Sequence, residues 1–341
     1  MVSGEGTQVA ATRPAASAAQ IAFQSVSKRY PGRGQAAVED LSFEVPSGEI
    51  CVLIGPSGCG KTTALKMVNR LIPMTGGDIT IDGKSVNAIE TSQLRRGVGY
   101  VFQQIGLFPH MTVQDNIGTV PRLLGWSKGR IRERALELLE LVGLGEEDNL
   151  RRYPGEFSGG QQQRIGVARA MAVDPPIMLM DEPFGAIDPI TRDRLQDDFL
   201  RLHREVRKTI IFVTHDIDEA IKMGDLIAIM RDGRLVQIDT PDNLLAAPAD
   251  EFVAGFVGAD RGLKRLRVWT LGDLDLDPLA RSSDTLPSAP AGTSLRDALS
   301  LMLTAGASRV AVLGEDEAAA GSVSLEAIAA ILGPQARAPG P

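Results

Sequence analysis

A short stretch without large side chains, GPSGCGKTT at residues 55–63, has the composition of a phosphate-binding loop. It contains three glycines and one lysine, and it lies between the apolar run 50–54 and the helix-like segment 64–68. The stretch fits the pattern G-x-x-x-x-G-K-[ST], in which glycines let successive backbone amides point at phosphate oxygens. The following helix directs its N-terminal dipole at the same point. The predicted nucleotide contacts of this loop are Gly55, Pro56, Ser57, Gly58, Cys59, Gly60, Lys61, Thr62 and Thr63.

Two side chains at the end of this loop predict a bound nucleotide with its cation. The charge of Lys61 suits the β- and γ-phosphates, and the Thr62 hydroxyl suits Mg²⁺. We therefore expect ATP and Mg²⁺ as ligands. The alternative, a plain glycine-rich turn, leaves the lysine and threonine at the start of a helix without a purpose.

A nucleotide loop requires a second element, an apolar strand that ends in an acidic residue, and IMLMDEP at 177–183 has this form. Asp181 is expected to hold Mg²⁺ through water. Glu182, the next residue, is placed to polarise the attacking water as a general base. Taken alone, the pair would fit an acidic strand end at the surface, but the phosphate loop makes the catalytic interpretation the stronger one.

The elements that must position these residues alternate between strands and helices. Strands are predicted at 21–26, 41–45, 49–54, 78–81 and 98–102, and again at 177–180, 209–214 and 226–230. The last three are almost entirely apolar, as is typical of strands buried on both faces of a parallel sheet. Between the two groups, residues 113–173 are predicted to be helical, with 131–142 the clearest helix. The fold class is therefore α/β, with a helical insertion.

Composition excludes several classes of protein. The chain has 341 residues, a net charge of −7 and an apolar fraction of 43%, which is ordinary for a globular protein. The acidic balance argues against a nucleic-acid partner. The two cysteines, Cys51 and Cys59, form no spaced zinc motif and suit a reducing compartment. No apolar run approaches the length of a membrane span, and residues 1–20 are expected to be a disordered leader.

A third motif, EFSGGQQQRIGVARA at 156–170, resembles the LSGGQ signature of ABC ATPases, with Phe157 in place of leucine. This resemblance covers about residues 20–260 and implies an ABC-type P-loop domain with a helical signature subdomain. In the family, the signature loop of one subunit closes over the γ-phosphate bound to its partner, which implies a homodimer. The signature residues implied to contact nucleotide are Ser158, Gly159, Gly160 and Gln161.

The resemblance also assigns roles to four single residues. Tyr30 in VSKRYPG resembles the aromatic residue that stacks on adenine, and Gln103 in GYVFQQ resembles the Q-loop glutamine near Mg²⁺ and the membrane partner. Asp188 in FGAIDP resembles the D-loop aspartate. His215 in FVTHD resembles the switch histidine that contacts the γ-phosphate. Catalysis is thus expected to depend on Glu182, His215 and Gln103, and the metal site on Thr62, Gln103 and Asp181.

Among ABC ATPases, the chain resembles importer subunits that work with separate membrane proteins. It has one nucleotide domain, no membrane span and no coiled-coil insertion, and QQIGLFPHMTVQDNI at 103–117 resembles the segment that receives a permease helix. The resemblance implies a peripheral protein at the cytoplasmic face of the membrane, with an extracytoplasmic solute-binding protein as an indirect partner. A regulatory ATP-binding switch without turnover is the alternative that Glu182 argues against. A soluble factor acting on nucleic acid is opposed by the acidic charge.

The segments QQIGLFPHMTV, FGAIDPITR and GADRGLKRLRV resemble the ATPases of quaternary-amine importers, which take up glycine betaine, choline, carnitine or proline. Importers of polyamines, amino acids or sugars remain alternatives, because the solute does not touch this subunit.

The C-terminal part is expected to be a separate unit. The predicted division is an ABC ATPase domain at 21–260, a linker at 261–292, a module at 293–333 and a disordered tail at 334–341. The module resembles one CBS unit, where such importers commonly carry two. It is expected either to pair with the module of the partner subunit, or to be only tethered, or to be a poorly folded remnant.

Overall fold

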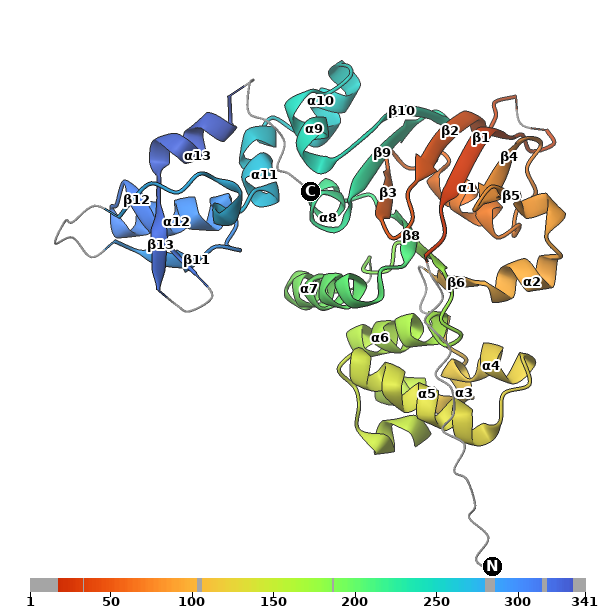
Figure 1. Ribbon diagram of the computed structural model, residues 1–341. Helices are drawn as coiled ribbons and strands as arrows, with labels where there is room; N and C mark the ends of the chain where they lie inside the picture. Colours follow the sequence, from red (N-terminus) through yellow and green to blue (C-terminus); the bar gives the residue numbers. More distant parts are fainter. Residues whose placement is uncertain are drawn as a thin grey trace, which may run out of the picture.

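The computed structural model describes residues 18–32, 34–102, 106–185, 187–279, 286–314 and 318–333. Its centre is a six-stranded sheet with the order β10-β9-β3-β8-β7-β6 (Figure 1). Its strands are β3 (Ile50–Ile54), β6 (Val98–Val101), β7 (Ile177–Asp181), β8 (Thr209–Val213), β9 (Leu226–Arg231) and β10 (Arg234–Asp239). The predicted α/β architecture is confirmed, and β10 is an added antiparallel edge strand.

The four inner strands explain where the site lies. Every residue of β3, β7 and β8 is buried, because apolar side chains pack against layers on both faces of the sheet. The parallel register pairs Leu53 of β3 with Val213 of β8, and Val213 in turn with Asp181 of β7. Since the carboxyl ends of parallel strands share one edge, the loops that follow β3, β7 and β8 are brought together there.

A second sheet is antiparallel and lies beside β10 (Figure 1). It has the order β2-β1-β4-β5 and consists of β1 (Ile21–Lys28), β2 (Val38–Val45), β4 (Gly76–Ile81) and β5 (Lys84–Ser85). Between the two sheets, helix α1 (Lys61–Val68) buries Leu65, Met67 and Val68 in a core shared by both. Helix α2 (Thr91–Arg96) leads back to β6.

The helical insertion contains α3 (Val113–Ile117), α4 (Thr119–Leu123), α5 (Lys128–Leu141) and α6 (Gly159–Ala170). These helices fall within the range predicted as helical and form the lower lobe in Figure 1. Apolar residues at helical spacing on α5, such as Ala135, Leu138 and Leu139, are buried against α3 and α6. The chain then returns through β7 to the long helix α7 (Pro189–Val206) and to α8 (Ile217–Met223).

The C-terminal part is a compact unit at the opposite end of the molecule from the antiparallel sheet (Figure 1). Helices α9 (Pro241–Ala246), α10 (Glu251–Val257) and α11 (Arg261–Val268) lead to a sheet with the order β11-β12-β13. The strands are β11 (Ser288–Pro290), β12 (Arg309–Leu313) and β13 (Ala319–Ser324), and they pack against α12 (Leu295–Ala305) and α13 (Leu325–Ile331).

The range predicted as a linker, 261–292, differs from the structure. Residues 261–268 form α11, and Leu266, Trp269 and Leu271 are buried in the same core as α12 and α13. Strand β11 also falls within the predicted linker. The sequence signal was weak because α11 carries four basic residues, one of which, Arg265, is buried by a partner distant in the sequence. The C-terminal unit is therefore joined to the ATPase core by a packed helix.

Among the residues that the structure describes, no helix is long and apolar enough to cross a membrane. The leader is predicted at 1–20, of which 1–17 lie outside the described residues, as does the predicted tail 334–341.

Candidate active site

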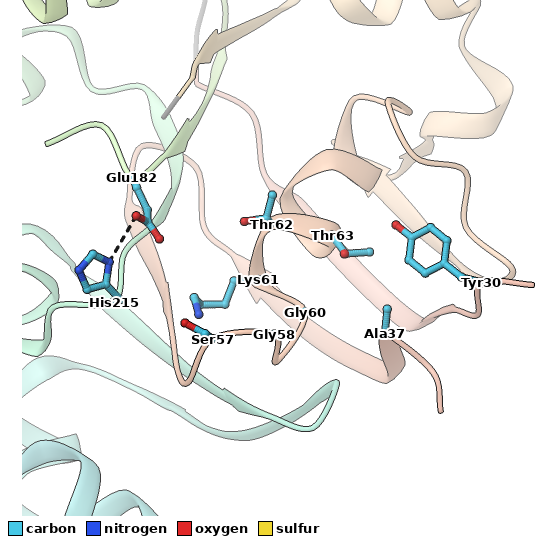
Figure 2. Close-up of a pocket in the computed structure, with 10 residues that line it drawn as sticks. All are labelled: Tyr30, Ala37, Ser57, Gly58, Gly60, Lys61, Thr62, Thr63, Glu182 and His215. Carbon is cyan, nitrogen blue, oxygen red and sulfur yellow. Dashed lines mark ion pairs between the residues drawn. The ribbon is translucent and has the colours of Figure 1, made fainter. Parts of the chain in front are cut away.

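A pocket of about 790 Å³ opens at the edge of the sheet where β3, β7 and β8 end. This volume suits a nucleotide-sized ligand. The described residues that line it are Tyr30, Ala37, Ser57, Gly58, Gly60, Lys61, Thr62, Thr63, Glu182 and His215. Figure 2 shows Glu182 and His215 at one end of the pocket, Tyr30 and Ala37 at the other, and the glycine-rich loop between them. Three motifs far apart in the sequence thus surround one space.

The loop after β3 depends on glycine for its path. Gly55, Gly58 and Gly60 all have positive φ angles, of 149°, 82° and 106°. A Cβ atom on Gly55 would lie 2.1 Å from the carbonyl oxygen of Met230, and one on Gly60 would lie 2.3 Å from that of Ala37. Both the backbone conformation and the close approach of neighbouring backbone therefore exclude a side chain. The loop is held in a tight turn, in which the amide of Cys59 donates to the carbonyl of Pro56 at 3.2 Å.

Lys61 begins α1 and is buried, although it also lines the pocket. Its ammonium group donates to the carbonyl oxygens of Gly55, at 2.7 Å, and Pro56, at 3.1 Å. The Cys59 sulfur lies 3.7 Å from the same nitrogen. Among the described residues no carboxylate lies within ion-pair distance of Lys61, although the charge of Asp181 acts on it from further away. An anion entering the pocket would meet this charge directly.

Thr62 and Asp181 place two oxygen atoms side by side. The Thr62 hydroxyl donates to Oδ1 of Asp181 at 3.0 Å, and the ammonium of Lys66 lies 3.9 Å from Oδ2. Burial raises the pKa of the Asp181 carboxyl, while the hydrogen bond from Thr62 and the charge of Lys66 oppose that shift. A hydroxyl and a carboxylate are hard oxygen ligands of the kind that Mg²⁺ prefers. The residues present therefore fit a magnesium site.

Glu182 and His215 meet across the ends of β7 and β8. Oε2 of Glu182 lies 3.3 Å from Nδ1 of His215, as the dashed line in Figure 2 marks. The backbone amide of Glu182 donates to the carbonyl of Val213 at 2.9 Å. Glu182 has a φ angle of 46°, in the left-handed region that non-glycine residues rarely adopt. Strain of this kind is found where the surrounding structure holds a side chain for a function.

The aromatic end of the pocket is formed by Tyr30, which follows β1. The ammonium of Lys28 lies 5.0 Å from the centroid of the Tyr30 ring, within the range of a cation–π interaction. Ala37, on the loop before β2, lines the pocket beside it (Figure 2). Ala37 was not among the predicted residues, since an isolated alanine before a strand carries no chemical signal.

The signature loop lies elsewhere. Ser158 caps α6, accepting from the amide of Gln161, whose side chain in turn accepts from the amide of Ser158. None of the four signature residues is among the described residues that line the pocket, and neither is Asp188. Asp188 caps α7 and accepts from the amide of Thr191, which lowers the pKa of its carboxyl. Gln103 lies outside the described residues.

The arrangement as a whole suits hydrolysis of a phosphate anhydride. The loop amides and Lys61 are positioned for an anion, the Thr62 and Asp181 oxygens for a cation, and the Glu182 carboxylate for a water molecule. Sequence reasoning had no signal for Lys66, which contributes to the charge around Asp181 from the next turn of α1.

Comparisons with known proteins agree with this geometry. A profile of the ABC transporter family matches residues 38–185. The osmoprotectant import ATP-binding protein OsmV of Salmonella typhimurium is 53% identical over 275 residues, which are 80% of this chain and 72% of OsmV. The choline transport ATP-binding protein OpuBA of Bacillus subtilis is 48% identical over 309 residues, which are 90% of this chain and 79% of OpuBA.

A solved structure is similar over the same region. It is a dimeric ATP-binding cassette, MJ0796, bound to ADP and Pi, with 33% sequence identity and a TM-score of 0.58. The similarity covers 64% of this chain and 98% of the cassette. The part of this chain that the cassette lacks corresponds in length to the leader and the C-terminal unit.

Proposed function

This chain belongs to the family of ABC transporter ATP-binding subunits of osmoprotectant uptake systems, and we propose that it hydrolyses ATP to power import of a quaternary amine. Glycine betaine, choline, carnitine and proline are the candidate solutes. The observation that carries the proposal is the single pocket in which Lys61, Thr62, Glu182 and His215 meet. The substrate class follows from the relatives, since no residue of this chain is expected to touch the solute.

In the proposed reaction, backbone amides of the glycine-rich loop and of the start of α1 bind the phosphates of ATP, and the Lys61 ammonium balances their charge. Tyr30 at the far end of the pocket offers its ring to the adenine. The pocket has room for a nucleotide between these two ends. This arrangement orients the terminal phosphate toward Glu182.

Thr62 and Asp181 would hold Mg²⁺, which neutralises charge on the phosphate oxygens when it is bound. The distance of 3.0 Å between their oxygens, and the raised pKa of the buried Asp181 carboxyl, support this assignment. Gln103 is proposed as a further ligand from the resemblance alone.

Glu182 would accept a proton from the attacking water, which then adds to the γ-phosphorus as the bond to ADP breaks. His215 lies within 3.3 Å of that carboxylate and is proposed to orient it and the terminal phosphate. The strained backbone of Glu182 supports a carboxylate held in place for the reaction.

The working form is proposed to be a homodimer in which each ATP lies between two subunits. The signature residues Ser158 to Gln161 stand at the N-terminus of a helix, where an anion is favoured, yet they do not line the pocket of their own chain. A partner subunit would supply them. The dimeric cassette bound to ADP and Pi supports this assembly.

The complex is proposed to sit at the cytoplasmic face of the membrane with permease subunits. Exposed aromatic side chains at Phe102 and Phe108 flank the Q-loop, and Leu123 and Leu124 are exposed on the helical subdomain nearby. These apolar groups suit the docking of a permease helix. A solute-binding protein would act on the other side, without contact to this chain.

We propose that the C-terminal unit is a single CBS-like module. The order β11-α12-β12-β13-α13 and the shared apolar core support a folded unit rather than a remnant. Ile328 and Ile331 of α13 are already buried within the chain, whereas Leu301 and Leu303 of α12 are exposed. Leu325, the first residue of α13, is also exposed, so pairing with the module of a partner subunit could use either helix.

Glu182→Gln tests the enzymatic proposal directly. The amide keeps the shape of the side chain and cannot act as the base, so hydrolysis should fall by about 10²–10⁴-fold while ATP still binds. Size-exclusion chromatography should show a dimer that depends on ATP. The matched control is Glu205→Gln, an exposed glutamate on α7. Wild-type hydrolysis in Glu182→Gln would overturn the assignment.

Uptake measurements test the solute. The chain is co-expressed with the permease and binding protein encoded beside it, and uptake of labelled glycine betaine, choline, carnitine and proline is compared with that of spermidine, an amino acid and maltose. Uptake of a quaternary amine that is lost with Glu182→Gln supports the proposal. Uptake of only the other solutes would assign the chain to a different importer class.

A further inference from the structure

The position of His215 depends on its backbone, because its side chain is 65% exposed. The flanking residues are well fixed. Thr214 is buried, and its hydroxyl accepts from the amide of Asp216 at 3.1 Å. Asp216 in turn caps α8, accepting from the amides of Asp218 and Glu219. Contacts that fix Thr214 and Asp216 therefore determine the distance between His215 and Glu182.

Arg192, on the first turn of α7, is one such anchor. One of its terminal nitrogens donates to the carbonyl oxygen of Ile187 at 3.0 Å, and the other lies 3.7 Å from Oδ2 of Asp216. Its guanidinium thus bridges the start of α7 and the loop that carries His215. The Nε atom of Arg192 is buried without a hydrogen-bond partner among the described residues. A buried donor left unpaired lowers stability, which argues for a role other than stabilisation.

A second link from α7 holds the other side of the same loop. Gln196, one turn further along the helix, donates to Oε1 of the buried Glu219 at 2.9 Å. The Thr214 hydroxyl also hydrogen-bonds to Glu219. Arg192 and Gln196 therefore clamp both ends of the segment 214–216 against one face of α7.

Residues next to Arg192 and Gln196 on α7 lie close to the signature loop. A Cβ atom built on Gly160 would lie 3.2 Å from Cγ2 of Thr191 and 3.5 Å from Cδ1 of Leu195. The same helical turn thus contacts the loop proposed to engage the ATP of the partner subunit and carries the arginine that reaches the His215 loop.

We propose that Arg192 is a positioning residue that holds His215 against Glu182 from the first turn of α7. The proposal rests on the proposed function, in which His215 acts in hydrolysis. Arg192 is not among the described residues that line the pocket, and it acts through Asp216.

The test separates binding from turnover. Arg192→Ala should lower the single-turnover rate of ATP hydrolysis about tenfold, because catalytic groups tolerate little displacement, while ATP affinity by calorimetry stays at the wild-type value. Arg192→Lys should be intermediate, since an ammonium keeps the charge but cannot bridge two acceptors as the planar guanidinium does. Asp216→Asn breaks the same link and keeps the helix cap. Arg194→Ala, exposed on the same helix, should hydrolyse ATP like the wild type.

A double-mutant cycle with His215→Ala decides whether Arg192 acts through His215. If it does, adding Arg192→Ala to the His215→Ala variant should not lower the single-turnover rate any further. A full tenfold loss in that background, or no loss in either Arg192→Ala or Asp216→Asn, overturns the inference. If His215→Ala itself hydrolyses ATP at the wild-type rate, the proposed role of His215 fails, and the two failures are thereby distinguished. Thermal unfolding of each variant verifies that it is folded.

Discussion

Two buried aspartates, Asp181 in the pocket and Asp242 at the joint with the C-terminal unit, have opposite surroundings. Asp242 accepts from Nε and a terminal nitrogen of Arg265 at 2.8 and 3.0 Å, and from the indole of Trp269 at 2.8 Å. The remaining terminal nitrogen of Arg265 donates to the carbonyl of Ile331 at 2.7 Å. Asp181 accepts from a threonine hydroxyl at 3.0 Å, and a lysine ammonium lies 3.9 Å away.

The difference separates a charge with a structural role from one for which we propose a role in metal binding. At the joint, each carboxylate oxygen and three guanidinium nitrogens are hydrogen-bonded, so the pair holds α9, α11 and α13 together without leaving a group for a ligand. In the pocket, the nearest cation of Asp181 is the Lys66 ammonium at 3.9 Å, and burial raises the pKa of the carboxyl. An incompletely compensated carboxylate is one that a bound cation would stabilise.

Asp242→Asn should give the largest effect, because it leaves the buried Arg265 without its charge partner. Losing one member of a buried pair is expected to lower the free energy of unfolding by about 3–5 kcal/mol. ATP hydrolysis well below the unfolding temperature should stay near the wild-type rate. Chemical unfolding followed by tryptophan fluorescence reports this joint, since Trp269 is part of it. The control is Asp275→Asn, exposed in the same unit, and equal stability of the two variants would contradict the comparison.

Lys61→Ala should weaken ATP binding by about 10- to 100-fold, which corresponds to the loss of hydrogen bonds to a charged group. The variant also removes the donor of the buried Gly55 carbonyl, so thermal unfolding is used to verify that it is folded. Isothermal titration calorimetry measures the affinity, with the exposed Lys128→Ala as control. Equal affinity in Lys61→Ala and the wild type would show that the loop is not a phosphate site.

Asp181→Asn should give the smallest effect on stability, with the opposite sign to Asp242→Asn. Because the folded-state pKa of Asp181 is raised above its ordinary 3.8, ionisation disfavours the folded chain. The ligand-free protein therefore loses stability as pH rises from that value through the raised pKa, and the loss persists above it. The asparagine variant should lack this component.

Unfolding at a series of pH values, without nucleotide or Mg²⁺, measures this component. As pH rises, the free energy of unfolding should decline less for Asp181→Asn than for the wild type. Addition of Mg²⁺ and ATP should stabilise the variant less than the wild type. A steeper decline in the variant would reverse the sign and refute the argument.

The chemistry of the pocket was predictable because each part is contiguous in the chain. The glycines and Lys61 follow one apolar strand, and Asp181 and Glu182 end another, so local patterns carry both signals. Parallel pairing then requires these strand ends to share one edge. The family resemblance drawn from the motifs is confirmed by relatives that are about half identical over most of the chain.

Two contacts could not be predicted in the same way: the pair of Asp242 and Arg265, and the contact of Arg192 with Asp216 beside His215. Arg265 meets Asp242 across 23 residues and Ile331 across 66. In the sequence, α11 is simply a basic segment next to a region rich in Asp, Pro and Ser, which is why it was assigned to a linker. Arg192 likewise is one of several charged residues on α7 until the fold brings Asp216 beside it.

The sequence by itself thus determined the family, the glycine-rich loop and the strands that flank it, since these depend on residue types at short spacing. The tertiary structure decided which buried charges are fully hydrogen-bonded within the chain, as Asp242 is, and which are incompletely paired, as Asp181 is. That distinction depends on residues distant in the chain. The local sequence around an arginine does not show whether it is buried, because burial depends on which other segments pack against it.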